Sequence, residues 1–442
     1  MNKISKKPSV NIISLGCSKN LVDSERLMLL LEEAGFDVRF ESDAPTDAAV
    51  VNTCGFIGDA KEESVNTILD LVSAKENGSI KHLYVMGCLA ERYRMDLEKE
   101  IPEVDGLFGK FDWQGIVDEL RRRYPSASAT TATTGSRGRR VTTSPANAYI
   151  KIAEGCNRFC AFCAIPLITG RFKSRAIEDI EEEVKALTAQ GYSEFNIIAQ
   201  DLSSYGTDIY GRLALAELIE RLADVPGVHW LRLHYAYPAQ FPYDILPVMR
   251  RRENVCAYLD IALQHIDDSV LANMRRHITG AQTRELLARI RKEVPGIHLR
   301  TTLMTGFPGE TEEAFEELMQ FVREQRFERM GAFAYSEEEG TFGAGHFSDD
   351  IPQEVKQGRL DRLMALQEEI SMEIQQQKVG QEIEVVIDSE EDDFYVGRSQ
   401  WDSPEVDPQV LVRKTATLRP GEYYRVKIVE ALPFELIAET VS

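Results

Sequence analysis

The sequence predicts a mixed α/β protein with three parts: an N-terminal Rossmann-like parallel α/β domain, a central partial (β/α)6 barrel and a C-terminal small all-β barrel. The first two parts are predicted from two stretches in which β-type runs alternate with helical runs. One stretch extends to residue 124, and the other begins at residue 146. Such alternation is typical of parallel sheets covered by helices. A third observation, short β-type runs without helices after residue 378, predicts the β module. We expect domains at 8–124, 146–376 and 378–442, with a linker at 125–145.

Composition limits the class of protein. The chain has 442 residues, of which 43% are hydrophobic and 28% charged, and this is typical of a soluble globular protein. A net charge of −21 disfavours free nucleic acid as a partner and favours a basic protein. The basic start "MNKISKKPSV" lacks the apolar run of a signal peptide, and no stretch approaches the roughly 20 apolar residues of a membrane span. We therefore expect a cytoplasmic protein whose 7 cysteines are reduced.

The first domain contains three strand-then-helix repeats, and a cysteine stands at the end of each strand. The strand runs are "VNIISLG", "AAVVNTC" and "KHLYVMGC", and the cysteines are Cys17, Cys54 and Cys88. A glycine beside each cysteine (Gly16, Gly55 and Gly87) allows close backbone approach. Since parallel strands end at one edge of their sheet, where open α/β sheets bind ligands, the three thiols are expected to converge. The alternative is three buried core cysteines, because cysteine is often buried.

The second domain follows a stretch rich in Ser, Thr, Ala, Gly and Arg, which can bury little and is typical of a linker. Six β-type runs then alternate with helical patterns: "AYIKIAEG", "EFNIIAQ", "VHWLRLHY", "AYLDIAL", "HLRTTLMTG" and "RMGAFAYS". One intervening helix, over residues 176–191, is supported by apolar Ile180, Val184 and Leu187 and by Gly191 as its end. Six units predict an incomplete barrel whose chemistry lies at the carboxyl ends of the strands.

Three cysteines stand close together after the first barrel strand, in "EGCNRFCAFC": Cys156, Cys160 and Cys163. A zinc site would need a fourth ligand, and the nearest downstream histidine is His229. A 4Fe–4S cluster held by three thiolates instead leaves one iron open. The spacing C-x₃-C-x₂-C at the start of a βα barrel, with Phe162 before the last cysteine, resembles the radical S-adenosylmethionine (SAM) superfamily. The resemblance implies that SAM binds the open iron and is cleaved to a 5′-deoxyadenosyl radical.

The resemblance extends over nearly the whole chain. "LGCSKNLVDSE", "NTCGFI", "GCNRFCAFCAIP", "AQDLSSYG", "LDIALQHI" and "GFPGET" together resemble the methylthiotransferases, which join a cluster domain, a radical-SAM barrel and a TRAM-type β module. The resemblance implies that Cys17, Cys54 and Cys88 hold a second 4Fe–4S cluster. "LGCSKNLVDSE" is similar to the branch that methylthiolates the β-carbon of an aspartate in small-subunit ribosomal protein S-twelve. The other branch modifies an adenosine of tRNA and is the alternative.

Charge offers a separate indication of the branch. Residues 379–442 contain 14 Asp and Glu against 6 Lys and Arg, a net charge of −8. A module that binds tRNA should be basic, whereas "DSEEDD" at 388–393 suits a basic ribosomal protein. The alternative for this charge run is a solvated loop. A non-catalytic iron–sulfur or zinc module that docks on ribosomes is the alternative from another functional class.

Four softer candidates lie at barrel strand ends. Gln200 and Asp201 end the second strand and are expected near the cofactor, although Asp201 could instead cap a turn. Gly306 and Gly309, in "TGFPGET", either line the cofactor site or form a turn before a helix.

The remaining candidates are expected to be structural. We expect His265 to have a structural role and Cys256 to lie in the core. Ala262 and Phe159 depart from the family pattern without affecting a thiolate ligand.

The resemblance implies a reaction in two stages. A methyl group passes from SAM to a sulfur on the N-terminal cluster. A radical from a second SAM then takes a hydrogen from the aspartate β-carbon, which collects the methylthio group. An electron donor is needed, and the sequence identifies neither that donor nor the sulfur donor. The protein contributes positioning and tuning of the cofactors.

Overall fold

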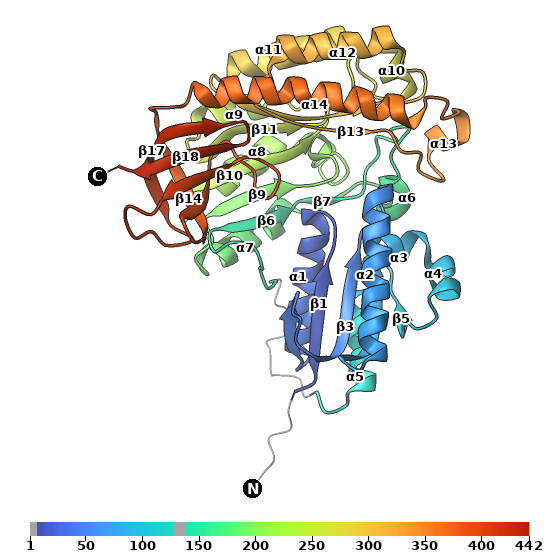
Figure 1. The fold of residues 1–442 in the computed structure, drawn as a ribbon. Helices are drawn as coiled ribbons and strands as arrows, with labels where there is room; N and C mark the ends of the chain where they lie inside the picture. Colours follow the sequence, from blue (N-terminus) through green and yellow to red (C-terminus); the bar gives the residue numbers. More distant parts are fainter. Residues whose placement is uncertain (1–6, 128–137, 442) are drawn as a thin grey trace. The chain divides into compact units, whose positions relative to one another are not determined.

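The computed structural model describes residues 7–127 and 138–441 (Figure 1). They form two compact units: residues up to 142 together with 164–170, and residues 143–163 together with 171 onward. The first six residues, where no signal peptide is expected, and the middle of the expected linker lie outside the described residues. No helix in the described part of the chain is long and apolar enough to cross a membrane.

The first unit contains a parallel sheet of five strands in the order β2-β1-β3-β4-β5. The strands are β1 (Ser9–Ser14), β2 (Asp37–Phe40), β3 (Thr46–Thr53), β4 (Ile80–Gly87) and β5 (Gly106–Leu107). Every neighbouring pair is parallel, which confirms the predicted Rossmann-like domain. The strand order reverses direction between β1 and β3, and ligands of such sheets bind outside the carboxyl ends at this switch point.

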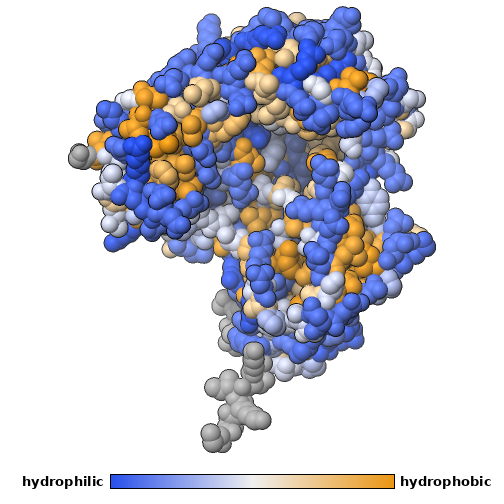
Figure 2. Space-filling view, viewed as in Figure 1, coloured by the Kyte–Doolittle hydropathy of each residue, from blue (hydrophilic) through white to orange (hydrophobic). Residues whose placement is uncertain are grey.

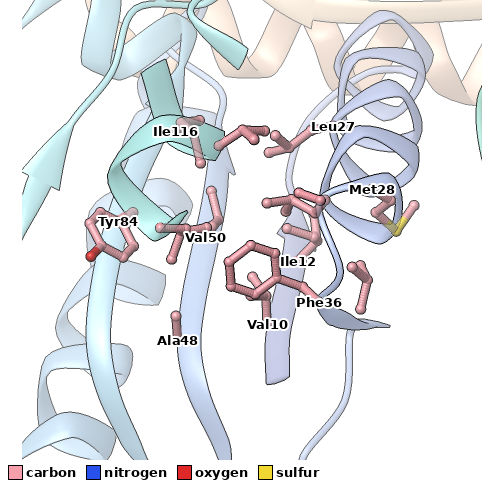
Figure 3. Packing of buried hydrophobic residues seen from close by; sticks show 14 of the residues in the cluster. Val10, Ile12, Leu27, Met28, Phe36, Ala48, Val50, Tyr84 and Ile116 are labelled. Carbon is pink, nitrogen blue, oxygen red and sulfur yellow. The ribbon is translucent and has the colours of Figure 1, made fainter. Parts of the chain in front are cut away.

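Helices cover both faces of this sheet. On one face, α1 (Ser18–Glu33) and α5 (Trp113–Arg123) pack on β1, β3 and β4, and Figure 3 shows Ile12 and Val50 facing Leu27 across this layer. On the other face lie α2 (Gly58–Glu76), α3 (Cys88–Arg92) and α4 (Arg94–Glu100). The β-branched residues of the strands thus form two buried layers, which fix the strand ends.

Part of the expected linker is packed rather than free. Arg139 makes a buried ion pair with Glu25 of α1, and the Thr142 amide donates to Glu25 at 2.7 Å. Arg140 pairs with Glu32 at 2.8 Å. Burial raises the pKa of Glu25 although Arg139 favours its charged form. Ion pairs therefore hold residues 139–142 on α1, and the low hydrophobicity of the stretch gave no sign of this contact.

The second unit contains an open barrel of six parallel strands in the order β13-β12-β11-β10-β9-β6. The strands are β6 (Asn147–Lys151), β9 (Glu194–Ile198), β10 (Trp230–Ala236), β11 (Val255–Ile261), β12 (His298–Thr305) and β13 (Arg329–Ala334). The helices around them are α7 (Ile177–Thr188), α8 (Leu215–Ala223), α9 (Ile245–Arg251), α10 (Asp268–Asn273), α11 (Gly280–Glu293) and α12 (Glu312–Gln325). The predicted partial (β/α)6 barrel is thereby confirmed.

Shorter elements complete the barrel ends. β7 (Ala153–Glu154) pairs with β8 (Lys173–Ser174), and the barrel cysteines lie in the stretch between these two strands. The 3-10 turn η1 (Leu202–Ser204) follows β9, and α13 (Phe342–His346) follows β13. The long helix α14 (Gln353–Gln376) then leads to the last module.

The C-terminal module is a closed barrel of five strands in the order β14-β15-β16-β18-β17. The strands are β14 (Glu382–Glu390), β15 (Phe394–Ser399), β16 (Gln409–Arg413), β17 (Tyr423–Leu432) and β18 (Glu435–Thr440). Their inward side chains form a separate apolar core. This confirms the predicted all-β barrel. The tip of its β14–β15 hairpin, here called the acidic tip, consists of the exposed residues Glu391, Asp392 and Asp393.

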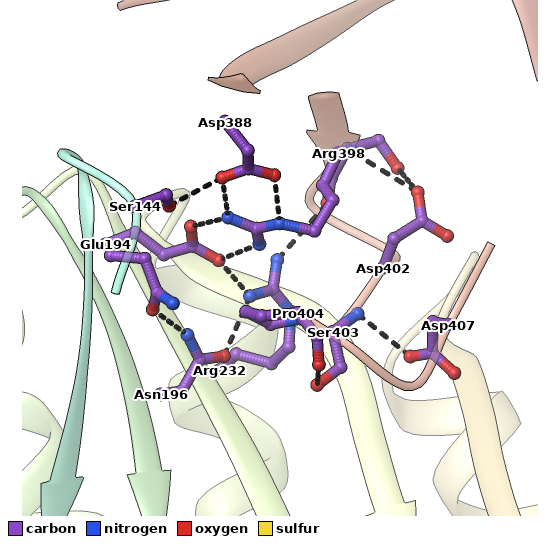
Figure 4. A network of polar contacts seen from close by, with 12 residues as sticks. Ser144, Glu194, Asn196, Arg232, Asp388, Arg398, Asp402, Ser403, Pro404 and Asp407 are labelled. Carbon is purple, nitrogen blue, oxygen red and sulfur yellow. Dashed lines mark hydrogen bonds and ion pairs between the residues drawn. The ribbon is translucent and has the colours of Figure 1, made fainter. Parts of the chain in front are cut away.

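The β module is attached to the amino-terminal end of the central barrel by buried charges (Figure 4). Arg398 of β15 grips Glu194, the first residue of β9, through two hydrogen bonds of 2.7 Å each. Asp402 pairs with Arg329, the first residue of β13, at 2.5 Å. The opposite, carboxyl-terminal end of the barrel holds the loop with the three cysteines.

The surface seen in Figure 2 is predominantly hydrophilic, and hydrophobic residues are visible in separate patches. Large exposed apolar side chains come from different elements, such as Met95 of α4 and Phe434 between β17 and β18. Scattered apolar residues of this kind are normal on globular proteins and identify no docking face.

Candidate functional site

The three N-terminal cysteines follow three adjacent strands, as the sequence predicts. Cys17 precedes α1 after β1, Cys54 directly follows β3, and Cys88 begins α3 directly after β4. Because β1, β3 and β4 are neighbours in a parallel sheet, the three side chains share its carboxyl edge. This edge includes the switch point between β1 and β3, where such sheets bind ligands.

Glycines bring the backbone close to these thiols. Gly16 has a φ of +87°, and a Cβ at this position would lie 2.9 Å from the Cys54 sulfur. Gly87 has a φ of +101°, and a Cβ there would lie 2.6 Å from the Thr53 carbonyl oxygen. Any side chain at either position would push the strand ends apart, so both glycines keep the cysteine edge compact.

Asn20 joins the N-terminal cysteines and was not identified from the sequence. Its side-chain amide donates to the carbonyl oxygens of Leu15 and Thr53, at 3.1 Å each, and its Oδ1 lies 3.5 Å from the Cys88 sulfur. Its backbone amide donates to the Cys17 carbonyl oxygen at 2.8 Å. One buried amide therefore links the ends of β1 and β3 to two of the cysteines. The only local signal was its place in "CSKN".

The pKa values of the three N-terminal cysteines are shifted in different directions. Burial raises the pKa of Cys54, and it raises the pKa of Cys88 to about 12. Desolvation also opposes charge on the Cys17 thiol, but Lys19 and Lys110 lower its pKa. Lys110 is itself buried and favours the thiolate form of all three cysteines. A cationic ligand would have to displace protons from Cys54 and Cys88, while Lys110 would stabilise the resulting thiolates.

The three barrel cysteines lie at the carboxyl end of β6, in the segment between β7 and β8. The Cys163 amide donates to the Cys160 carbonyl oxygen at 3.1 Å, and the Arg158 amide donates to the Cys156 sulfur at 3.4 Å. Phe159, between them, adopts a φ of +49°, which is uncommon for a residue other than glycine. Burial raises the pKa of Cys156 to about 12. The loop thus presents three thiols from one tight, partly strained turn.

Within the described residues, no three His, Cys, Asp or Glu side chains are close enough to hold a single metal ion. The zinc site considered from the spacing therefore has no preformed counterpart among these residues. A 4Fe–4S cluster spaces its ligand sulfurs farther apart than a single ion does. Two separate sets of three reduced cysteines are a donor set that suits such clusters.

Several buried polar atoms lie near the carboxyl ends of the barrel strands. Gln200 follows β9 and donates through Nε2 to Glu154 at 3.3 Å, but its Oε1 has no hydrogen-bond partner among the described residues. The Oδ1 atom of Asp201 is likewise buried and unpartnered there, while Oδ2 bonds to Arg158 Nε at 2.6 Å. Gln264, after β11, also has an unpartnered buried Oε1 and was missed from the sequence. Buried acceptors of this kind can accept hydrogen bonds from a ligand.

The other predicted residues are held by contacts within the barrel. Phe162 packs edge-on against Phe307, with ring centroids 6.4 Å apart, and thereby anchors the cysteine loop to the "TGFPGET" segment. A Cβ at Gly306 would collide with the Lys356 side chain at 2.3 Å, and one at Gly309 would lie 2.8 Å from Asn273. These packing requirements explain both glycines, so their contact with a cofactor remains a prediction.

His265 and Cys256, expected to be structural, are both buried. His265 is fully buried with Nε2 3.3 Å from Glu310 Oε2, and its Nδ1 accepts a hydrogen bond from the Asp267 amide. Cys256 is buried against Trp230 in the core between the barrel and the β module.

Three family models match the chain in order. Residues 9–109 match a family described as uncharacterized (UPF0004), residues 150–322 match the radical SAM superfamily, and residues 379–441 match the TRAM domain.

Relatives match over the full length. A Parabacteroides distasonis protein named ribosomal protein uS12 methylthiotransferase RimO is 56% identical over 439 residues, covering 99% of this chain and 100% of that protein. A Phocaeicola vulgatus protein of the same name is 57% identical over 435 residues, covering 98% and 99%. One from Christiangramia forsetii is 49% identical and covers 99% and 95%.

Solved structures share the fold at low identity. The radical SAM methyltransferase TsrM from Kitasatospora setae, solved with cobalamin and a [4Fe-4S] cluster, gives a TM-score of 0.56 at 15% identity and covers 76% of this chain and 77% of that chain. The cobalamin-dependent radical enzyme OxsB gives 0.53 at 13% identity, covering 83% and 56%.

Proposed function

This chain belongs to the family of ribosomal protein uS12 methylthiotransferases, and from this premise we propose how its residues carry out the reaction. It is an enzyme of the radical SAM class that transfers a methylthio group. We propose that its substrate is the β-carbon of an aspartate in uS12, the S-twelve protein of the small ribosomal subunit, and that the reaction takes place in the cytoplasm.

Two separate cysteine sets carry the proposal of two 4Fe–4S clusters. The N-terminal cysteines (Cys17, Cys54 and Cys88) would hold one cluster, and the barrel cysteines (Cys156, Cys160 and Cys163) the other. Each set provides three thiols at the carboxyl end of a parallel sheet, which leaves one iron of each cluster without a protein ligand. When bound, the barrel cluster would supply the electron for the reductive cleavage of SAM, and the N-terminal cluster would supply the sulfur of the methylthio group.

The chain's own residues prepare these sites by losing protons. Burial raises the pKa values of Cys88 and Cys156 to about 12 each, so iron would have to displace their protons when it binds. Lys110 then offsets negative charge at the N-terminal set. Coupling of proton loss to iron binding means that assembly of both clusters should be favoured as pH rises.

We propose that the buried acceptors at the carboxyl ends of the barrel strands orient SAM. The oxygens of Gln200, Asp201 and Gln264 are the candidates for its ammonium and adenine amino groups. Arg158 keeps Asp201 in place through its 2.6 Å ion pair, so one carboxylate oxygen is committed and the other remains available.

The acidic tip supports a basic protein substrate over tRNA. Part of the negative charge of the β module is neutralised, because Asp388 pairs with Arg398 of the module, and Asp402 and Asp407 pair with arginines of the barrel. The acidic tip remains exposed to solvent. Exposed carboxylates repel phosphate and attract basic proteins, and we therefore propose that the tip contributes to the choice of uS12.

The test is a reconstituted reaction with the full chain. The protein is loaded anaerobically with iron and sulfide and incubated with SAM, sulfide, a low-potential reductant and recombinant uS12. We expect 5′-deoxyadenosine, and by mass spectrometry a uS12 in which one methylthio group replaces one hydrogen. Alanine at all three barrel cysteines should abolish both products. Alanine at all three N-terminal cysteines should abolish methylthiolation and leave 5′-deoxyadenosine.

Two outcomes would contradict the proposal. Methylthiolated uS12 from the variant without N-terminal cysteines would remove the second cluster from the mechanism. Modification of tRNA in place of uS12, when both are offered, would assign the chain to the tRNA alternative.

A further inference from the structure

A buried arginine contacts the barrel cysteines directly. Arg276 is only 3% exposed, and its Nη1 donates to the Cys160 sulfur at 3.2 Å. Its Nη2 donates to the Ala262 carbonyl oxygen, and its guanidinium lies 4.2 Å from the centre of the Tyr237 ring. The side chain is therefore fixed on three sides with one N–H group aimed at a sulfur.

Other buried arginines of this unit have carboxylate partners, and Arg276 does not. Arg232 pairs with Glu194, Arg329 with Asp402 and Arg359 with Glu310. Among residues 7–127 and 138–441, Arg276 forms no ion pair with a carboxylate, and its Nε is buried without an acceptor. A buried charge without a counter-charge is strongly unfavourable, so the negative charge that balances Arg276 must come from the thiolate side. That side is the site proposed for the barrel cluster.

The backbone around Arg276 is strained and tightly held. Arg275 and His277, on either side, have φ values of +57° and +56°. The Arg276 amide donates to Leu271 at 2.9 Å, and the Tyr237 hydroxyl donates to the Arg276 carbonyl oxygen at 2.7 Å. Strain of this kind persists where the surroundings fix the conformation, and it is frequent at functional sites. In this conformation the Arg276 side chain is buried, whereas Arg275 is half-buried and His277 is exposed.

The cysteine loop is tied to the same segment. The Ala161 amide, next to Cys160, donates to the Met274 carbonyl oxygen at 2.9 Å. The Gly343 amide donates to the Ala161 carbonyl oxygen at 2.6 Å. The first of these bonds ties the residue after Cys160 to the segment of Arg276, and the second ties the same loop to α13. The surrounding hydrogen bonds therefore fix the contact between the Arg276 guanidinium and the Cys160 sulfur.

A second arginine near the site shows the contrast. Arg158 lies 4.2 Å from the centre of the Tyr237 ring, but its charge is neutralised by Asp201. The charge of Arg276 is not neutralised in this way. An arginine guanidinium keeps its positive charge at all ordinary pH values. Arg276 thus stays positive beside the sulfur.

We propose that Arg276 is a positioning residue that raises the reduction potential of the cluster held by the barrel cysteines, an inference that rests on the proposed function. Reduction adds one electron from an external low-potential donor, and no bond forms or breaks. The reduced cluster with its thiolates carries one more negative charge than the oxidised one. A buried positive charge and a hydrogen bond to a ligand sulfur favour the more negative state. Arg276 would thereby ease the electron transfer that SAM cleavage requires.

The test measures the midpoint potential of that cluster alone. All variants are full-length and carry alanine at the three N-terminal cysteines, so that only the barrel cluster assembles. Iron content and the electron paramagnetic resonance signal are followed through an anaerobic redox titration. In Arg276→Gln, which removes the charge, we expect the ratio of reduced to oxidised cluster at a fixed potential to fall about ten-fold, a shift of about 59 mV for one electron. Arg276→Lys, which keeps the charge but not the planar fork, should shift in the same direction by less.

Arg329→Gln is the matched control, because Arg329 is equally buried but lies at the opposite end of the barrel. Its potential should equal that of the parent. An unchanged potential in Arg276→Gln, or an equal shift in both glutamine variants, would overturn the inference while leaving the proposed function intact. If Arg276→Gln does not bind iron, a parent-like potential in Arg276→Lys would overturn it. Failure of the parent itself to assemble a cluster would overturn both proposals.

Discussion

Replacing Arg398 with methionine should loosen the β module from the barrel. Arg398 is 4% exposed and serves two carboxylates at once. It bonds both oxygens of Glu194 at 2.7 Å each, and both oxygens of Asp388 at 2.6 and 2.8 Å. Glu194 is fully buried, so the substitution would leave it with Arg232 as its one remaining cationic partner among the described residues.

The expected cost follows from this geometry. Removing one partner of a buried ion pair costs about 3–5 kcal/mol, because the remaining charge stays buried without compensation. The loss of four charge-assisted hydrogen bonds favours a cost in the upper part of this range. The contact of Glu194 with Arg232 remains and lowers the cost. We therefore expect the free energy of unfolding of the barrel and module to fall by about 4 kcal/mol.

Urea denaturation followed by tryptophan fluorescence measures this change. Trp230 packs on Tyr423 of the module, with ring centroids 5.0 Å apart, and Trp401 stacks on His298 of β12 at 4.6 Å. Both tryptophans therefore report on the contact between barrel and module. Arg413→Met is the control, since Arg413 lies in the same module but is 45% exposed beside Glu439. Its loss should cost about 1 kcal/mol or less, and an equal cost for both variants would refute the reasoning.

Three further predictions concern metal content, acid stability and partner choice. The reconstituted chain should bind about eight irons, and alanine at either cysteine set should halve this number in iron analysis. Burial opposes charge on Glu194 and Asp402, but neighbouring arginines lower both pKa values to about 2. Because these folded values lie below the unfolded ones, the stabilisation is complete above about pH 4.5 and is lost as pH falls toward 2, which circular dichroism should detect. Lysine at all three acidic-tip positions should weaken binding to uS12 and strengthen binding to tRNA, with a salt-dependent difference in fluorescence anisotropy.

Each of these predictions has a control. Cys256→Ala should leave the iron content unchanged, because Cys256 lies in the core between the barrel and the β module. Glu194→Gln should remove part of the acid transition, and an identical acid profile would contradict the assignment to Glu194. Lysine at the exposed Glu98, Glu100 and Glu103 changes the net charge equally at a different place. If that variant alters binding as much as the acidic-tip variant, net charge and not the tip decides the partner.

The sequence predicted the strands that bury β-branched residues and the edge at which the N-terminal cysteines meet. That success has a physical reason, since the ends of parallel strands share an edge whatever the strand order. The strands β2 and β5 were missed because they have 4 and 2 residues and no distinct apolar alternation. The strand order itself depends on pairing between distant segments, which no local pattern reports.

The surroundings of the barrel cysteines were not predictable in the same way. Arg276 is 116 residues from Cys160 in the sequence, and nothing in "MRRHITG" indicates that one arginine turns inward while Arg275 does not. The docking of Arg139 on Glu25 was hidden for a similar reason, because a stretch of low hydrophobicity can still be held by a buried ion pair. Long-range polar contacts form only in the folded chain, whereas apolar periodicity can be detected within a short stretch of sequence.

The two ends of the central barrel use buried arginines for different purposes. At the amino end, Arg232 and Arg329 are each paired with a carboxylate, and the module's Asp402 supplies one of these partners. Such pairs lock the module and leave no charge for a ligand. At the carboxyl end, Arg276 meets a cysteine sulfur in place of a carboxylate. A substitution at the amino end should therefore change stability without changing the cluster potential. A substitution of Arg276 should change the potential, and the same pair of measurements separates a structural arginine from one that serves the reaction.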